Sequence, residues 1–500
     1  MANEEYKELM KKYEEIYILG SISGVLTWDT ETTMPRNAIQ HRSKQFRYIS
    51  EQTHKLSTNE QFGLLLNKLS DNDDLNKIEK RNVELLKRRY DTASKIPIDL
   101  VGEMSAQSKK TNESWKTAKS KQNFSIVMND LKKLIELNID YSTKLADIRG
   151  INDPYSARIS ERDFGFSVDQ ITKYFNEAKS FLIPFIQQTL DKQRDLDFEF
   201  RNRPVPKTVQ VKVVEEIAKS FKYDFNRETG LGRIGEVEHP LTIGCGPQDV
   251  RITVKYGDFI QVMNATAHEL GHGLHGIHKN QEYVYQPINS FGFPSLGECT
   301  SRYTENKIGN SREFQSYFFP IMQKLTNGIF DDLDFESYFR GFTRVKPHTS
   351  RMEADELTYG LHIIIRFELE RDLFAGKISV EELPSLWNEK YKEYLGVNVP
   401  NDSLGIMQDL HWYNVYWAYF QGYFLGDLMG SQLHHHMNST NPEWKTNMME
   451  GDLSTVLNYN IENVYSKGAL YDPLDLVKHV TGESLQTKYF VDYLKEKYTF

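Results

Sequence analysis

The segment His268-Glu-Leu-Gly-His272 combines side chains that can perform hydrolytic chemistry at a spacing that brings them together. On an α-helix, residues four apart lie on one face, so the two imidazoles can hold one Zn²⁺ ion. Glu269, next to the first histidine, then stays free to accept a proton from water at the metal. The pattern H-E-x-x-H is typical of zinc peptidases, and it predicts a metal-dependent hydrolase.

A catalytic zinc site needs a third protein ligand besides the two histidines. Glu298 follows His272 by 26 residues, and Pro294 and Gly297 stand just before it. These helix-start signals predict that Glu298 lies on a second helix packed against the first. A His-His-Glu set suits hydrolytic Zn²⁺ and also accepts Co²⁺.

Other side chains leave alternatives open for the metal. His275 and His278 lie further along the same predicted helix, and a thiolate at Cys299 could also bind a metal. The tract His434-His435-His436 has a metal-binding composition. Three consecutive residues on a helix point in different directions, which favours an ordinary polar helix face for this tract.

The elements around the motif are predicted from hydrophobic spacing. Residues 258–267 lack Pro and Gly and repeat apolar residues at helical spacing, so the H-E-x-x-H segment is expected on a long helix. Residues 249–256 alternate with period two and predict a strand directly before that helix. As an edge strand beside the metal, it could hold an extended peptide through backbone hydrogen bonds. Elsewhere helical patterns dominate.

Composition limits the class of protein. The chain has 500 residues, of which 39% are hydrophobic, and no linker or repeat interrupts it. We therefore expect a mainly α protein: one large helical body over residues 1–500, with a possible division into two lobes around a deep active-site groove. The zinc-binding core should span about residues 239–430. The net charge of −9 argues against a nucleic-acid partner.

Targeting signals and cysteine content indicate the compartment. The N-terminus is charged and lacks the apolar core of a signal peptide. The longest uncharged aromatic run, residues 410–426, is interpreted as a buried cleft wall, so no membrane partner is expected. Cys245 and Cys299 do not make a disulfide framework. A reducing, cytoplasmic location is expected.

Further motifs give the sequence a family likeness. Their positions are Trp28-Asp29, Thr33-Met-Pro35, Arg42, His239-Pro-Leu241, Asp249-Val-Arg-Ile-Thr253, Ser350-Arg-Met-Glu-Ala-Asp355 and Gly405-Ile-Met-Gln-Asp-Leu-His-Trp412. Together with H-E-x-G-H and Glu298, this ordered set resembles the M32 family of metallocarboxypeptidases, the carboxypeptidase Taq type. The resemblance spans nearly the whole chain. The sequence departs from the family pattern around Glu298, where Gly297, Cys299 and Thr300 stand, and before Arg351, where Ser350 replaces an isoleucine.

The resemblance implies a fold, an activity and an assembly. It implies a gluzincin-like helical body with a deep groove and a divalent metal, usually zinc and sometimes cobalt. It implies removal of single residues from the C-termini of peptides with a free carboxylate, usually by a cytoplasmic homodimer. It also implies His268, His272 and Glu298 as metal ligands.

The motif positions supply candidates for the remaining steps. Arg351 is the expected anchor of the substrate carboxylate, because a guanidinium binds a carboxylate through two parallel hydrogen bonds. Tyr423 and His411 are expected to donate hydrogen bonds to the oxyanion that forms during hydrolysis. The remaining candidates are expected to line the substrate site. They are His239, Asp249 and Arg251, of which the last two are interpreted mainly as fixing the strand and its loop.

Two other functions fit parts of the sequence. A zinc oligopeptidase that cleaves internal bonds would share the metal site but need no carboxylate anchor, and Arg351 argues against it. An inactive peptide-binding relative would not need His268, Glu269, His272 and Glu298 intact.

Overall fold

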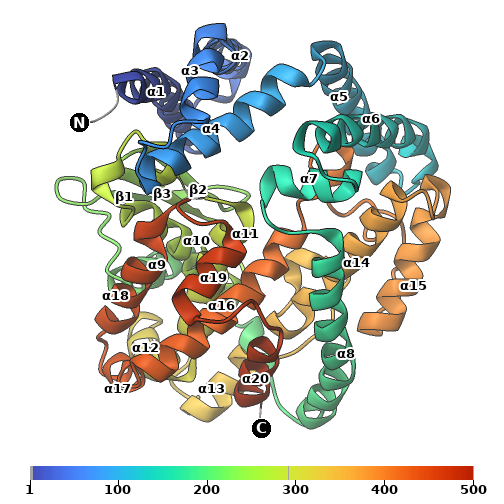
Figure 1. The fold of residues 1–500 in the computed structure, drawn as a ribbon. Coiled ribbons are helices and arrows are strands. Elements are labelled where there is room, and N and C mark those ends of the chain that lie inside the picture. Colours follow the sequence, from blue (N-terminus) through green and yellow to red (C-terminus); the bar gives the residue numbers. More distant parts are fainter. Residues whose placement is uncertain (1–3, 291, 499–500) are drawn as a thin grey trace.

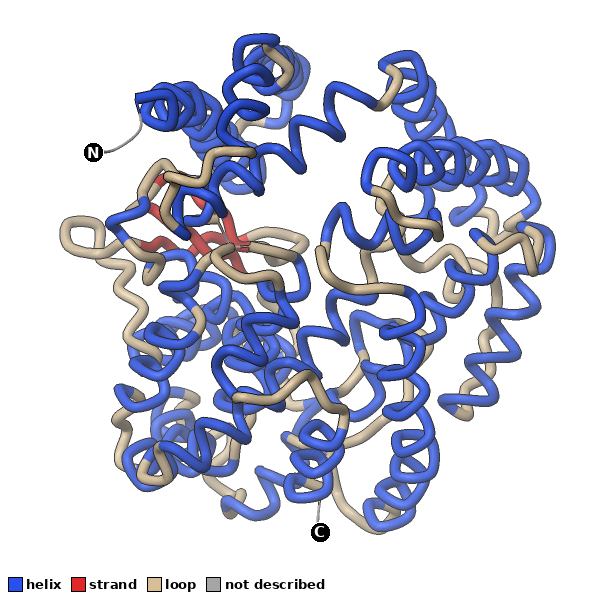
Figure 2. Tube along the Cα trace, in the orientation of Figure 1, coloured by secondary structure: helices blue, strands red, loops and turns tan. Residues whose placement is uncertain are grey.

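Helices make up most of the molecule, as Figures 1 and 2 show. The computed structural model of the protein describes residues 4–290 and 292–498. The helices of the first half are α1 (Glu4–Thr32), α2 (Ile39–Ser57), α3 (Glu60–Ser70), α4 (Lys77–Lys95), α5 (Ile98–Ser120), α6 (Ser125–Arg149), α7 (Pro154–Arg162), α8 (Val168–Gln193) and α9 (Lys207–Ser220). Helices α1 and α4 end shortly before Pro35 and Pro97, because the residue that precedes a proline disfavours helical backbone.

The second half is helical after a short β region. Its helices are α10 (Phe259–Ile277), α11 (Pro294–Arg302), α12 (Arg312–Leu325), α13 (Phe335–Phe342), α14 (Glu356–Phe374), α15 (Leu383–Leu395), α16 (Gln421–Thr440), α17 (Trp444–Met449), α18 (Ser454–Asn463), α19 (Pro473–Thr481) and α20 (Lys488–Lys497). α14 and α16 are buried on nearly all sides. The mainly α fold with a small β element, predicted from the sequence, is confirmed.

The β element is a three-stranded sheet of β1 (Gly232–Glu236), β2 (Thr242–Gly246) and β3 (Asp249–Val254). The strand order is β1-β3-β2, with β1 parallel and β2 antiparallel to β3. The predicted strand is therefore present, but the expectation that it is an edge strand is wrong. Both sides of β3 are occupied by neighbouring strands, so its backbone cannot pair with a peptide. The two edge strands are β1 and β2, and β2 carries Thr242.

The helix that carries Glu298 is held between two others by close backbone contacts. A Cβ atom on Gly271 of α10 would lie 2.6 Å from the Cα of Ser301 in α11. A Cβ on Gly426 of α16 would lie 2.7 Å from the carbonyl carbon of Glu298. Only glycine permits these approaches, so both residues fix how near α11 lies to the H-E-x-x-H helix. This explains the Gly inside His268-Glu-Leu-Gly-His272.

The N-terminal helices are attached to the sheet. Arg42 of α2 donates to Asp29 at 2.6 Å and to the Leu26 carbonyl oxygen at 2.7 Å, and so joins α2 to α1. α1 in turn contacts β2. The residues of the N-terminal family-like segment thus connect helices, and their packing supports the sheet below them (Figure 1).

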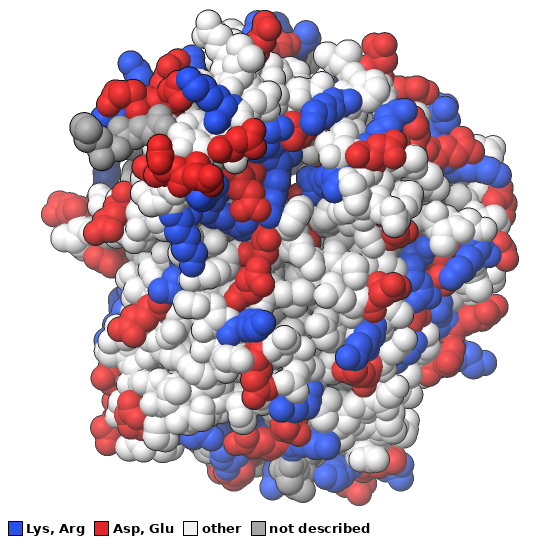
Figure 3. Space-filling model, in the orientation of Figure 1, with Lys and Arg blue, Asp and Glu red and all other residues white. Residues whose placement is uncertain are grey.

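The exterior carries charges of both signs. Figure 3 shows Lys and Arg interspersed with Asp and Glu on the face it draws. Among residues 4–290 and 292–498, no helix has the length and apolar content needed to span a bilayer. The largest buried cluster combines residues from Ala118 to Tyr498, and a smaller one joins Tyr6 to Leu86. The single-domain organisation expected from the sequence stays a prediction.

Candidate active site

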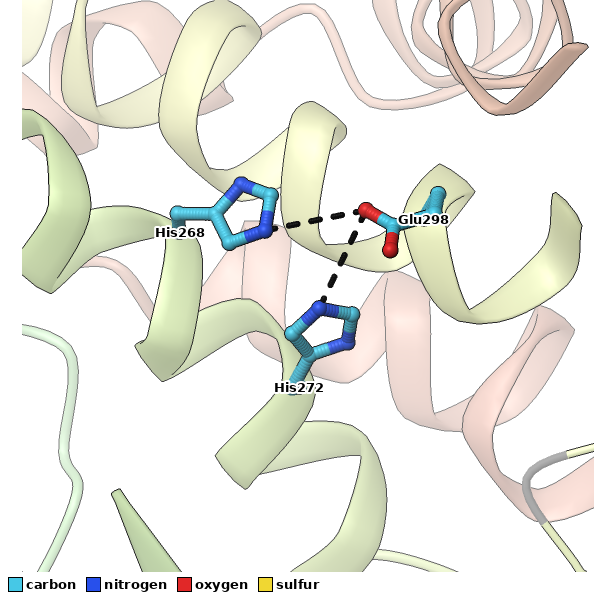
Figure 4. A group of neighbouring side chains, drawn as sticks. All are labelled: His268, His272 and Glu298. Carbon is cyan, nitrogen blue, oxygen red and sulfur yellow. Dashed lines mark ion pairs between the residues drawn. The ribbon is translucent and has the colours of Figure 1, made fainter. Parts of the chain in front are cut away.

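The structure brings His268, His272 and Glu298 together. The histidines lie one turn apart on α10, and Glu298 faces them from α11 (Figure 4). The Oε2 atom of Glu298 is 3.6 Å from Nε2 of His268 and 3.9 Å from Nε2 of His272. The three ligand-type atoms lie within 4.8 Å of one another. They are too far apart for good hydrogen bonds, and this spacing suits coordination of one shared cation.

A second carboxylate orients the first histidine. Nδ1 of His268 lies 2.9 Å from Oε2 of Glu305, which leaves Nε2 directed at Glu298 and His272. Glu305 also accepts a bond of 3.2 Å from Arg302. Burial lowers the pKa of His268, but Glu305, Glu298 and Glu269 outweigh this and raise it to about 9. The surroundings of His268 therefore favour a positive charge, which a metal would supply.

Glu305 owes its position to an irregular helix. Residues Tyr303–Gly309 continue α11 as a π-helix, in which each turn holds an extra residue. Glu305 is seven residues after Glu298, so the two carboxylates approach the same histidine from successive turns. Sequence reasoning did not identify Glu305. The separation from Glu298 by two helical turns is the signal that could have indicated it.

Glu269 points toward the sheet and not toward the three-atom group, which is the set of ligand-type atoms of His268, His272 and Glu298. Its carboxylate accepts a hydrogen bond of 2.6 Å from the Thr242 hydroxyl on β2. Burial raises the pKa of Glu269 to about 6, although His268 and Thr242 act to lower it. A carboxylate whose pKa lies near neutrality can both accept and return a proton. Thr242 was also missed from the sequence, where its position directly after His239-Pro-Leu241 was the available signal.

Arg351 is buried beside an acid that the sequence did not assign to it. The residue lies in a short 3₁₀ turn, and its guanidinium donates to Asp409 at 3.0 Å and to the Tyr359 hydroxyl at 3.1 Å. Asp409 also pairs with Arg366 of α14 at 2.6 Å. Burial would raise the pKa of Asp409, but both arginines hold it far below its usual range. Two cations thus share one carboxylate.

Neighbouring acids in the sequence have other partners. Asp355 accepts the backbone N–H of Thr358 at 2.9 Å and caps α14, while Glu353 lies 3.2 Å from His348. Among the described residues, the acid that pairs with Arg351 is therefore Asp409. Asp409 belongs to the Gly405–Trp412 motif, whose Gln408 accepts the backbone N–H of Arg351 at 3.0 Å. The two motifs are one structural unit.

His411 and Tyr423 belong to an aromatic group next to Arg351. The His411 ring stacks on Tyr419 at 5.5 Å, and Tyr423 meets Tyr419 edge-on at 5.6 Å. The Arg351 guanidinium lies 5.3 Å from the Tyr423 ring centre. Burial lowers the pKa of His411 to about 4 and raises that of Tyr423 well above its usual value. At neutral pH His411 is uncharged and Tyr423 keeps its proton, so both can donate hydrogen bonds.

The three remaining substrate-site candidates lie on the sheet and its loops. His239 is exposed on the loop between β1 and β2. Asp249 and Arg251 pair with each other through two bonds of 2.7 and 2.5 Å on β3, and the Arg251 guanidinium lies 5.3 Å from the ring of Trp28. This arrangement agrees with a role in fixing the strand. A direct contact of these three residues with substrate stays a prediction.

The competing metal ligands lie elsewhere. His275 is buried with its ring stacked on Tyr465 at 5.2 Å, and burial lowers its pKa to about 3. Burial raises the pKa of the Cys299 thiol to about 12. His434 is buried, His435 is exposed and His436 contacts the Tyr459 hydroxyl, as expected for consecutive helical residues. Within the described residues, His268, His272 and Glu298 form the one group of three that could hold a metal.

The helical body and the paired α10 and α11 define a class of protein. An H-E-x-x-H helix that faces a glutamate from the next helix, with a buried glutamate of near-neutral pKa beside it, is the arrangement of a metallopeptidase.

Comparisons with known proteins specify the class further. The family model described as carboxypeptidase Taq (M32) metallopeptidase matches residues 8–498. Carboxypeptidase 1 of Bacillus subtilis is 32% identical over 99% of this chain and 98% of its own. Thermostable carboxypeptidase 1 of Pyrococcus furiosus is 30% identical over 99% of both chains. The solved M32 carboxypeptidase of Deinococcus radiodurans superposes with a TM-score of 0.94 at 28% identity, over 99% of each chain.

The chain belongs to the carboxypeptidase Taq (M32) metallopeptidase family. It is a metallocarboxypeptidase, a hydrolase that acts on peptide bonds. The family resemblance inferred from the motifs is confirmed. Membership does not assign a role to any single residue of this chain.

Proposed function

We propose that the protein is a zinc-dependent carboxypeptidase that removes single residues from peptide C-termini, with Glu269 as the general base. The observation that carries this proposal is the convergence of two imidazole nitrogens and one carboxylate oxygen within 4.8 Å, next to a buried glutamate. His268, His272 and Glu298 would hold the ion. A bound Zn²⁺ ion supplies a Lewis acid that polarises the scissile carbonyl and lowers the pKa of water.

The protein side chains then manage the protons and the developing charge. Glu269 accepts the proton of the attacking water and delivers it to the amine that leaves. Thr242 holds the Glu269 carboxylate in place through its 2.6 Å hydrogen bond. Tyr423 and His411, both in their hydrogen-bond-donating forms at neutral pH, stabilise the oxyanion derived from the carbonyl oxygen.

Arg351 anchors the terminal carboxylate in this proposal. Its Nε and Nη2 atoms face Asp409 and its Nη1 atom faces Tyr359, and these bonds use three of its five N–H groups. The two remaining N–H groups, one on Nη1 and one on Nη2, suit a carboxylate. Burial raises the pKa of Glu298, and the charge of Arg351 is among those that act to lower it, so Arg351 is near enough to influence this proposed metal ligand.

Digestion of paired peptides tests the proposal against its alternatives. Metal-loaded protein is incubated with one peptide in free-acid and C-terminally amidated forms, and the products are followed over time by mass spectrometry. We expect a ladder of products that shorten by one residue from the free C-terminus. Internal cuts in both peptides would favour an oligopeptidase, and intact peptides would favour a binding protein.

Zinc and cobalt are the metals proposed for the site. Two neutral nitrogen donors and one carboxylate suit Zn²⁺, and the same set accepts Co²⁺. Activity of the apo-protein after addition of Zn²⁺, Co²⁺, Mn²⁺ or Mg²⁺ ranks the metals. We expect Zn²⁺ and Co²⁺ to restore activity and Mg²⁺ to fail, because Mg²⁺ prefers six oxygen ligands.

A homodimer and a cytoplasmic location complete the proposal. On α1, buried residues come only from its first three turns, and Ile18, Ile22 and Val25 further along are each more than 40% exposed. This apolar stripe at helical spacing suits a second copy of the chain. Light scattering measures the mass, and an Ile22→Glu variant should shift it toward the monomer.

Free cysteines at Cys245 and Cys299 fit a reducing compartment, which supports the proposed cytoplasmic location.

A further inference from the structure

Arg162 is a cation without a paired acid near the candidate active site. It is the last residue of α7, and its guanidinium lies 5.5 Å from the ring centre of Tyr416 and 5.3 Å from that of Tyr419. Its Nε atom is buried without a hydrogen-bond partner, and no ion pair joins Arg162 to an acid within the part of the chain that the structure describes. Burial lowers the pKa of Arg162, as expected for a desolvated cation.

A second arginine on the same helix shows what a purely structural role looks like here. Arg158, one turn earlier, pairs with Glu161 and donates to the Val415 carbonyl oxygen at 3.1 Å. Glu161 also accepts a 2.6 Å bond from the Tyr141 hydroxyl. The nearest acid in the sequence to Arg162 is therefore already engaged. Two arginines on one face of α7 differ in that one has a carboxylate and the other does not.

The other neighbouring acid is bound through one oxygen, while its Oδ2 atom is buried without a hydrogen-bond partner. Asp163 accepts the backbone N–H of Ser295 at 2.8 Å at the start of α11, the helix that carries Glu298. Asp163 is buried, and burial raises its pKa to about 6. Its contact with Ser295 places the end of α7 one turn before the proposed third metal ligand. Arg162 therefore lies beside the helix that shapes the metal site.

The rings around Arg162 connect it to the groups proposed to act on substrate. Tyr419 stacks on His411 and meets Tyr423 edge-on, as described above. The charges of both Arg162 and Arg351 act on His411 and Tyr419. Tyr416 is 45% exposed, and Arg162 itself is half-buried. The Tyr419 ring thus connects Arg162 to His411 and Tyr423.

We propose that Arg162 is a substrate-binding residue that pairs with a carboxylate of the bound peptide, in a recess formed with Tyr416 and Tyr419. This inference rests on the proposed function, since it requires a peptide substrate beside His411. Tyrosine rings next to a guanidinium leave its edge N–H groups free, and those groups recognise carboxylates in pairs. The carboxylate can be the peptide terminus or the side chain of an acidic residue near it, and experiment separates the two.

Four peptides measured with the metal-loaded enzyme test this proposal. One pair differs only in a free or amidated C-terminus. The other pair, both with free C-termini, differs only in Glu or Gln as the last residue. In Arg162→Gln we expect kcat/KM to fall further for the carboxylate member of one pair than for its neutral member. The preference within that pair should drop on the order of 10- to 100-fold. The pair affected identifies the source of the carboxylate.

Two further variants separate recognition from folding. Arg162→Lys keeps the charge but loses the planar fork, so we expect it to recover only part of the preference. Arg47→Gln removes an arginine whose side chain is 80% exposed on α2, and it should leave both preferences unchanged. Thermal unfolding of all variants monitors stability.

The outcomes are distinct. Equal losses within both pairs in Arg162→Gln, or full preference in a folded Arg162→Gln enzyme, would overturn the proposal. If Arg162→Gln does not fold, the same comparison is made with Arg162→Lys. Failure of the wild type to cut any of the four peptides would refute the proposed function instead.

Discussion

Two groups of polar and charged side chains in the active-site region differ in how closely their members pair with one another. At the metal site, two imidazole nitrogens and a carboxylate oxygen converge at 3.6 and 3.9 Å. At the arginine cluster, Arg351 and Arg366 share Asp409 at 3.0 and 2.6 Å. The first group brings together three ligand-type atoms that suit one shared cation. The second is a preformed ion network that keeps one surplus positive charge for an anion.

The contrast divides the chemistry between the two groups. The ligand atoms of His268, His272 and Glu298 lie too far apart for good hydrogen bonds with one another, so the metal group depends on an added ion. The arginines are desolvated but paired, so their geometry is fixed before substrate arrives. Changes at the metal group should therefore abolish the reaction, whereas changes at the arginine cluster should alter which peptides are used.

Removal of the metal should have the largest effect. Exhaustive chelation leaves three acceptors without a shared cation, so activity should disappear and return with added Zn²⁺ or Co²⁺. Activity on a free-acid peptide and elemental analysis are measured on the same samples. Full activity in protein shown to contain no metal would exclude a metal-dependent mechanism.

Replacement of the proposed base should follow in size. Glu269→Gln keeps the shape and can still accept the Thr242 hydrogen bond, but it cannot take a proton at neutral pH. We expect kcat to fall on the order of 10²–10⁴-fold. The metal content should remain that of the wild type, because Glu269 faces Thr242 and not the three-atom group. Loss of metal in this variant would show that Glu269 is a ligand.

Arg351→Ala should distinguish the role of the arginine cluster in substrate recognition from the role of the metal site in hydrolysis. The terminal carboxylate would lose its anchor, and Asp409 would keep Arg366 alone. The loss of transition-state stabilisation for free-acid peptides should be about 2–5 kcal/mol. Amidated peptides should be poor substrates of the wild type and nearly indifferent to the mutation. The ratios of kcat/KM for the two peptides in both proteins give the coupling.

Two controls sharpen this test. Arg351→Lys should recover little, because an ammonium cannot reproduce the two-pronged contact. Asp409→Asn leaves Arg351 in place but removes the shared carboxylate, so it tests whether orientation of Arg351 matters. Equal losses on free-acid and amidated peptides in Arg351→Ala would assign Arg351 to the fold alone, and the carboxylate anchor would have to lie elsewhere.

The same contrast explains what the sequence could predict. His268, His272 and Glu298 were predictable because local helix spacing places two of them and helix-start signals place the third. The placement of the two histidines on one helix and of Glu298 on a second helix packed against it is confirmed, and their role as metal ligands stays a prediction. The family and the mainly helical fold were also predictable, since motifs in chain order span the whole sequence.

Long-range partners were not predictable in this way. Asp409 is 58 residues from Arg351, so no local pattern indicates that the two side chains pair. The position of β3 in the centre of the sheet depends on β1, whose glycine-containing segment carries little strand signal. Thr242 depends on strand register, which side-chain periodicity does not give, and Glu305 was indicated only by its spacing of seven residues from Glu298.

The smallest expected effect concerns Glu305, which contacts His268 but is not one of the three proposed metal ligands. Its carboxylate lies 2.9 Å from Nδ1 of His268 and fixes the orientation of the imidazole. Glu305→Gln keeps an acceptor for that nitrogen but removes the negative charge, so His268 becomes a weaker donor to a cation. Zinc affinity should fall about 10- to 100-fold, while kcat at saturating Zn²⁺ should change much less. Competition with a fluorescent zinc chelator measures the affinity.

Glu336→Gln serves as the matched control. It breaks a surface pair with Arg312 whose two side chains are each 52% exposed. If Glu305→Gln bound zinc as tightly as this control, Glu305 would act only through Arg302 on the packing of α11. The metal group would then depend on its three converging atoms alone.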